Sequence, residues 1–152
     1  MAQQFFSFTD PSRAHFLGGF PAKNAAELCT GKLAVLNTDG TMQQATAADE
    51  PSGFVQTNRL LTWAPTTQYA DALENVTLVS GDVMAVCDNG FFVGSTLPAA
   101  GSPLYSAAGG LMDTTGTNHV GKVMGGAYDQ RAAPNSTQRI VMIVCSFSGK
   151  EV

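Results

Sequence analysis

Short apolar runs bounded by glycine recur along this chain, and they restrict it to a fold built of short strands. The run Gly81–Cys87 leads into Asp88-Asn89-Gly90, after which Phe91-Phe92-Val93 begins a second run of strand-forming residues. Asn and Gly adopt positive φ at little cost, so two such runs around Asn-Gly predict a β-hairpin. In this interpretation Gly90 holds a positive φ, as does Gly40 in its own turn.

The glycine spacing also indicates an imperfect internal repeat. In three segments the second glycine lies nine positions after the first: Gly31–Gly40, Gly81–Gly90 and Gly101–Gly110. Gly53-Phe-Val and Gly121-Lys-Val close the first and third copies. The alternative, in a chain with 16 glycines, is chance recurrence.

Further strands are expected between and after these segments. They cover Arg59–Pro65, Glu74–Ser80, Gly121–Tyr128 with a bend at Gly125-Gly126, and Arg139–Phe147. Only residues 67–75 suit a helical turn. Many short strands with glycine-rich turns predict an all-β fold, a small β-barrel or sandwich built of short hairpins, in a single domain over residues 25–152.

Residues 1–24 differ from the rest of the chain and form a predicted N-terminal arm. This segment is interrupted by Pro11 and Pro21, which argue against a helix or a central strand. It carries five phenylalanines, which are Phe5, Phe6, Phe8, Phe16 and Phe20. Either these side chains fold back onto the domain's own core, or an extended arm docks on a neighbouring subunit. We take the five as candidate partner-interface residues, because buried aromatic side chains tend to dominate such contacts.

The charge content of the chain limits the kinds of partner that it can bind. Only 13% of the residues are charged, against roughly 25% in a typical soluble domain. A surface this poor in charge suits a protein that is largely covered by partners. The net charge of −4, with basic residues scattered along the chain, argues against binding to a phosphate backbone, so no nucleic-acid partner is expected.

The cysteines and the N-terminus point to an intracellular product. Cys29, Cys87 and Cys145 are an odd number and widely spaced, which predicts reduced, buried thiols. The first residues lack the basic start and the apolar core of a signal peptide. The clearest unbroken aliphatic run, Ile140–Val144, is far below the about 20 residues that span a bilayer, so no membrane partner is expected.

No residue pattern supports catalysis. Gly116–Val123 imitates a phosphate-binding loop, but Val123 stands where a Ser or Thr is needed and a strand is expected to follow instead of a helix. His15 and His119 are the only histidines, and neither has a metal-ligand spacing to a cysteine or to the other. We expect no catalytic residue, no cofactor and no metal site.

Three segments in the second half of the chain share a pattern of glycines and apolar residues: Ala99-Ala-Gly101-Ser-Pro-Leu-Tyr105, Gly109-Gly110-Leu-Met and Thr117-Asn-His-Val-Gly121-Lys-Val-Met-Gly. In this pattern the chain resembles the capsid cement, or head decoration, proteins of tailed bacteriophages. Gly81-Asp82-Val83, together with Gly31–Leu36, Asp39-Gly40 and Gly53-Phe-Val, is similar to other parts of these proteins. The resemblance covers residues 28–147 and consists of glycines and strands, without a signature site.

This resemblance implies a structural virion protein that binds the outside of the phage head. It would be made in the host cytoplasm, act as a homo-oligomer with a trimer favoured, and brace junctions between subunits of the major capsid protein. Two alternatives share the composition. One is a tail or baseplate β module, and the other is a carbohydrate- or ligand-binding β domain that would use Trp63 and Tyr69 as a stacking platform.

Overall fold

The computed structural model describes residues 6–9, 12–57, 70, 75–130 and 138–147, and of these it describes residues 125–130 and 138–139 by their backbone alone. It confirms the all-β class. The strands are β1 (Phe6–Phe8), β2 (Ala14–Pro21), β3 (Leu33–Leu36), β4 (Met42–Gln44), β5 (Gly53–Gln56), β6 (Asn75–Cys87), β7 (Pro103–Ser106), β8 (Met112–Asp113), β9 (His119–Gln130) and β10 (Gln138–Ser146). Short 3-10 turns are η1 (Ala25–Glu27), η2 (Asn89–Phe91), η3 (Val93–Ser95) and η4 (Ala108–Gly110).

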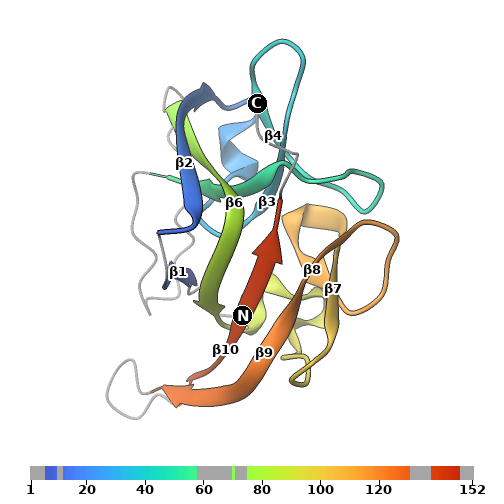
Figure 1. Ribbon diagram of the computed structural model, residues 1–152. Helices are drawn as coiled ribbons and strands as arrows, with labels where there is room; N and C mark the ends of the chain where they lie inside the picture. The colour runs from blue at the N-terminus through green and yellow to red at the C-terminus, as the bar shows by residue number, and fades with distance from the viewer. Residues whose placement is uncertain (1–5, 10–11, 58–69, 71–74, 131–137, 148–152) are drawn as a thin grey trace.

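One curled antiparallel sheet contains the strands in the order β4-β3-β5-β6-β10-β9-β7-β8, and both β1 and β2 pair with β6 (Figure 1). The long strand β6 is the centre of the fold. Its first half lies between β2 and β5, because Val79 pairs with both Phe16 and Phe54. Its second half lies between β1 and β10, because Cys87 pairs with both Phe6 and Val141. Every described position of β6 from 85 to 87 therefore has a neighbour on each edge.

The predicted hairpin across Asp88-Asn89-Gly90 is wrong. Gly81 lies inside β6, where a φ of +78° bends the strand, and the strand continues to Cys87. The Asp88 carboxylate accepts the Gly90 N–H at 2.9 Å and caps η2. Gly90 does not have the positive φ that the hairpin required. The physical reason is the sheet itself, since β1 and β10 occupy both edges on which a returning strand could pair.

The first and third glycine segments do form hairpins, as predicted. β3 pairs with β4, and β7 pairs with β8, both antiparallel. β7 lies 70 positions after β3 (33 to 103) and β8 begins 70 positions after β4 (42 to 112). Gly40 has the predicted positive φ, +86°. The strands expected at 74–80, 121–128 and 139–147 are confirmed as the first half of β6, β9 and β10, and Gly53-Phe-Val, which closes the first copy, lies in β5. The strand expected at 59–65 and most of the helical turn expected at 67–75 lie outside the described residues.

The internal repeat extends far beyond these hairpins. We call residues 14–81 repeat 1 and residues 82–146 repeat 2. Repeat 1 connects β2, β6, β5, β3 and β4, and repeat 2 connects β6, β10, β9, β7 and β8 in the same order. In each repeat, a parallel β-bridge joins the last strand to the segment that follows the first strand. Ala22 pairs with Met42 in repeat 1, and Phe92 pairs with Met112 in repeat 2, again 70 positions later.

Backbone hydrogen bonds recur at matching positions in the two repeats. Gly31 N–H donates to Val55 O at 3.0 Å, and Gly101 N–H donates to Val123 O at 2.8 Å. The reciprocal bonds, Val55 N–H to Lys32 O and Val123 N–H to Ser102 O, are both 2.9 Å. The close backbone contacts of two strand glycines recur as well. A Cβ at Gly53 would overlap Val79 O, and a Cβ at Gly121 would overlap Val144 O. The glycine pattern therefore reflects two copies of one strand arrangement.

Each repeat contributes to a hydrophobic core. The interior of repeat 1 is formed by Leu28, Ala34, Met42, Val55, Ala70, Val76 and Leu78. A larger cluster combines the interior of repeat 2 with the contact between the repeats, where Leu33, Phe54 and Val79 meet Val83, Cys145 and Phe147. Polar contacts join the repeats too. Ser106 Oγ donates to Thr46 O at 2.8 Å, and the Lys32 ammonium donates to Gly109 O at 3.2 Å. Burial lowers the pKa of Lys32 below its usual value.

Candidate partner-binding surface

The N-terminal segment is extended in conformation, and its described residues lie on the domain. Thr9 N–H donates to Met84 O at 2.9 Å and Asp82 N–H donates to Arg13 O at 3.4 Å, so β1 and β2 follow one another along the same edge of β6 (Figure 1). Residues 6–8 and 14–21 of the predicted arm thus form strands of the same sheet as the rest of the domain.

A ladder of phenylalanine rings leads from the core to the surface along this edge. Phe6 is only 4% exposed, and its ring centroid lies 5.0 Å from Phe54 and 5.2 Å from Phe91. The Phe8 ring lies 5.1 Å from Phe6 and 5.8 Å from Phe16, in edge-to-face geometry. Phe16 ends the ladder with 41% of its side chain exposed. The rings therefore connect a core residue to a solvent-facing one.

The five candidate interface residues consequently differ in what they can contact. Phe6 lies in the chain's own core, as the fold-back alternative predicted, and its ring is enclosed by other phenylalanines of the same chain. Phe20 is half-buried against the interior of repeat 1. Phe8 is half-buried and Phe16 is exposed. Phe5 lies outside the described residues, as do Trp63 and Tyr69.

Among the described residues, two more large apolar side chains are exposed, and sequence reasoning missed both. Val93, in η3, is 44% exposed, and Met124, on β9, is 36% exposed. On the outer face of the sheet, half-buried Met84 and Val144 are cross-strand partners next to Met124's strand. A cavity of about 270 Å³ opens beside them, lined by Arg13, Asp82, Val83, Met84 and Val144. Apolar surface is thus available on several elements of the sheet.

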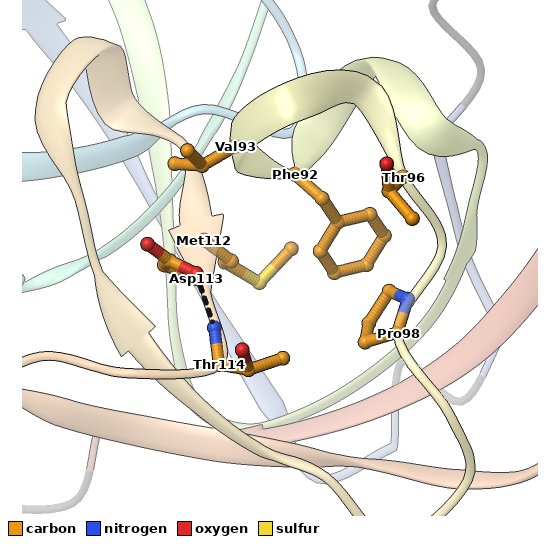
Figure 2. A pocket seen from close by; sticks show the side chains of 7 residues that line it. All are labelled: Phe92, Val93, Thr96, Pro98, Met112, Asp113 and Thr114. Atoms are coloured by element: carbon orange, nitrogen blue, oxygen red, sulfur yellow. Dashed lines mark hydrogen bonds between the residues drawn. The ribbon is translucent and has the colours of Figure 1, made fainter.

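A second cavity lies in repeat 2, between β8 and the 92–98 segment. Its volume is about 210 Å³, and it is lined by Phe92, Val93, Thr96, Pro98, Met112, Asp113 and Thr114. Figure 2 shows the Phe92 and Met112 side chains pointing toward each other between the residues of the rim. The Asp113 carboxylate accepts the Thr114 N–H at 2.7 Å at that rim.

The three cysteines are buried and none of them forms a disulfide, as predicted: Cys29, Cys87 and Cys145. Desolvation raises the pKa of the Cys29 thiol to about 11, despite the nearby Lys32, and it also raises the pKa of the Cys87 and Cys145 thiols above their usual value. These thiols are therefore protonated at neutral pH, which disfavours nucleophilic or metal-binding roles.

Among the described residues, the histidines and acidic residues do not form a metal-binding cluster either. The His119 ring is exposed and lies edge-to-face with Tyr105, with centroids 5.3 Å apart. The strand β9 begins at His119, so the Gly116–Val123 segment is a turn followed by a strand, as predicted. Within the described part of the chain, no three His, Cys, Asp or Glu side chains are placed to hold a metal ion. None of its helices is long and apolar enough to cross a membrane.

No protein-family model, curated protein sequence or solved structure matches this chain.

Proposed function

We propose that this protein is a non-catalytic structural component of a phage virion. In this role it binds the exterior of the head and cements junctions between major capsid protein subunits. The observation that carries the proposal is the exposure of large apolar side chains on three separate elements, which are Phe16 on β2, Val93 in η3 and Met124 on β9. A protein that bridges several subunits needs contacts on several sides, and engaging them together gains avidity without any catalytic group.

The strand order separates these contacts. In the sheet, β6 and β10 lie between β2 and β9, so Phe16 and Met124 belong to different flanks of the molecule (Figure 1). With only 13% charged residues, the chain has few side chains whose desolvation would oppose such contacts. Part of the glycine pattern behind the resemblance to cement proteins has positive φ outside the strands, at Gly31, Gly101 and Gly110.

Co-sedimentation with empty heads, assembled from the cognate major capsid protein, tests the proposal. The wild-type protein should bind saturably at a fixed ratio to the capsid subunit, and sedimentation equilibrium of the free protein measures whether it is the expected trimer. Phe16→Ala should weaken binding by about tenfold or more, because aromatic anchors at interfaces are commonly worth about 2 kcal/mol.

His15→Ala is the matched control. It removes a ring from the neighbouring exposed position of β2, and successive strand residues point to opposite faces. Binding of this variant should equal that of the wild type. A folded wild-type protein that does not sediment with heads would contradict the head-cement function and favour a tail component or a ligand-binding module, for which a glycan screen is the next measurement.

A further inference from the structure

The strand β1 covers part of the aromatic core from the edge of β6. Among the described strands it pairs with β6 alone, with positions 6–8 opposite positions 85–87. The Phe6 ring packs against Phe54 and Phe91 at centroid distances of 5.0 and 5.2 Å, and both of these side chains are fully buried. A strand of only three residues therefore covers two aromatic side chains of the core.

The surroundings of β1 are fitted to its phenylalanine ring. Gly31 has a φ of +96°, and a Cβ at this position would lie 2.6 Å from the Phe6 ring and 2.7 Å from the Phe91 ring. We call Gly31, Phe54, Phe91 and the 85–87 edge of β6 the β1 slot. An empty slot would expose aromatic rings to water, so each domain needs one β1 strand in it. A β1 strand from another copy has the same sequence and therefore fits the slot equally well.

The connection between β1 and β2 is longer than its path along β6 requires. The Thr9 N–H donates to Met84 O at 2.9 Å, and the Asp82 N–H donates to Arg13 O at 3.4 Å, so both ends of the connection contact β6. Extended chain from Thr9 to Arg13 would span about 13 Å, whereas β6 rises only about 7 Å between Met84 and Asp82. The Arg13 contact is also long for a hydrogen bond. The connection thus has enough length to extend and carry β1 away from its own β6.

We propose that β1 is exchanged between copies of this protein, so that Phe6 and Phe8 of one chain occupy the β1 slot of a neighbouring chain. The exchange retains the contacts of β1 with the slot and changes only the path of residues 9–13. The ring contact between Phe8 and Phe16, at 5.8 Å, would then join two chains. Phe6 makes the same contacts in the closed and the exchanged form, so its burial is equal in both.

The occupant of the slot is identified by the strand that fills it. A closed ring of copies, in which each chain donates its β1 to the next, leaves no slot empty. Such a ring would form the homo-oligomer expected of the proposed function. The exchange itself concerns self-association only, so it is tested without heads, and its failure leaves the head-binding proposal to its own experiment.

Two single-cysteine variants detect the exchange directly. Ser7 and Val86 are opposite each other across β1 and β6, and both are half-buried. Opposite residues of antiparallel strands have Cα atoms about 4.5–5.5 Å apart, a distance that a disulfide bridges. The Ser7→Cys and Val86→Cys proteins, one of them carrying an affinity tag, are unfolded together, refolded at high concentration under reducing conditions and then oxidised. Neither chain contains both new cysteines, so a disulfide between positions 7 and 86 requires β1 of one chain to pair with β6 of the other.

The expected result is a covalent heterodimer that contains about half of the Ser7→Cys chains, because each slot receives a β1 of either variant with equal chance. Non-reducing gels measure its amount, and peptide mapping by mass spectrometry identifies the linked positions. The matched control is a mixture of Met84→Cys and Val144→Cys proteins. These positions are also half-buried and opposite each other, but across β6 and β10, which stay in one chain, so no heterodimer should form.

A second variant locks β1 in place. The Ser7→Cys/Val86→Cys double variant, refolded and oxidised at low concentration, bonds β1 to its own β6. It should stay monomeric in sedimentation equilibrium at concentrations where its reduced form associates, and circular dichroism checks that both forms are folded. Absence of the heterodimer, a wild-type protein that stays monomeric, or a locked variant that associates like its reduced form would each overturn the exchange.

Discussion

The position of Phe6 separates a phenylalanine that stabilises the fold from one that serves a partner. Its side chain is 4% exposed and its ring contacts Phe8, Phe54 and Phe91 at centroid distances of 5.0–5.2 Å. Truncating a buried Phe to Ala costs about 3–5 kcal/mol, because the transfer energy of the ring is lost and a cavity remains. Phe6→Ala should lose a comparable free energy of unfolding.

That loss converts into a large change in melting temperature. A domain of this size shifts by about 2–4 °C for each kcal/mol, so Phe6→Ala should melt roughly 6–20 °C below the wild type. Phe16→Ala is the comparison, because 41% of its side chain is already exposed and its truncation should cost less than half as much. Thermal unfolding, followed by calorimetry and by circular dichroism, measures both.

The two variants should show opposite effects in head binding. Phe6→Ala, assayed well below its melting temperature, should bind heads like the wild type, whereas Phe16→Ala should bind them about tenfold or more weakly. If Phe6→Ala melted within 2 °C of the wild type and lost head binding, the ring would not be a core residue. The assignment of β1 to the chain's own sheet would then be wrong, and the docking-arm interpretation would replace it.

Two further predictions concern the turns and the thiols. Gly40→Ala should destabilise the protein by about 1 kcal/mol or more, because Gly40 has a φ of +86°. Gly90→Ala should lower the free energy of unfolding clearly less, because Gly90 does not have a positive φ. Equal losses in urea unfolding would contradict the assignment of the two turns. The three cysteines should not react with Ellman's reagent at pH 8 in the native protein, because they are buried and burial raises each thiol pKa above 9. All three should react in guanidinium. Rapid labelling of any one of them in the native state would refute its burial.

The sequence alone determined the strands and the turns that close through local contacts. At Asp39-Gly40 the carboxylate accepts both the Thr41 N–H, at 3.0 Å, and the Thr41 hydroxyl, at 2.6 Å, so a few neighbouring residues define the turn. The Asp39 side chain is exposed, and the hydrogen bonds from Thr41 lower its pKa. The repeat at Gly31 and Gly101 was also visible, because equal backbone geometry requires glycine at both positions.

The tertiary structure decided which strand edges were free and which surfaces were covered. Asp88-Asn89-Gly90 has the composition of a hairpin turn, yet β1 and β10 already flank Cys87, so the chain turns away and buries Phe91 and Phe92. No local pattern distinguishes Phe6 from Phe16, since one is buried and the other exposed only because of what packs around each strand. Ala70 is likewise buried by a tertiary contact, because its N–H donates to the carbonyl of Leu28, far away in the sequence. Turn chemistry is local and can be read from neighbours, whereas edge occupancy and burial are set by strands brought together from the whole chain.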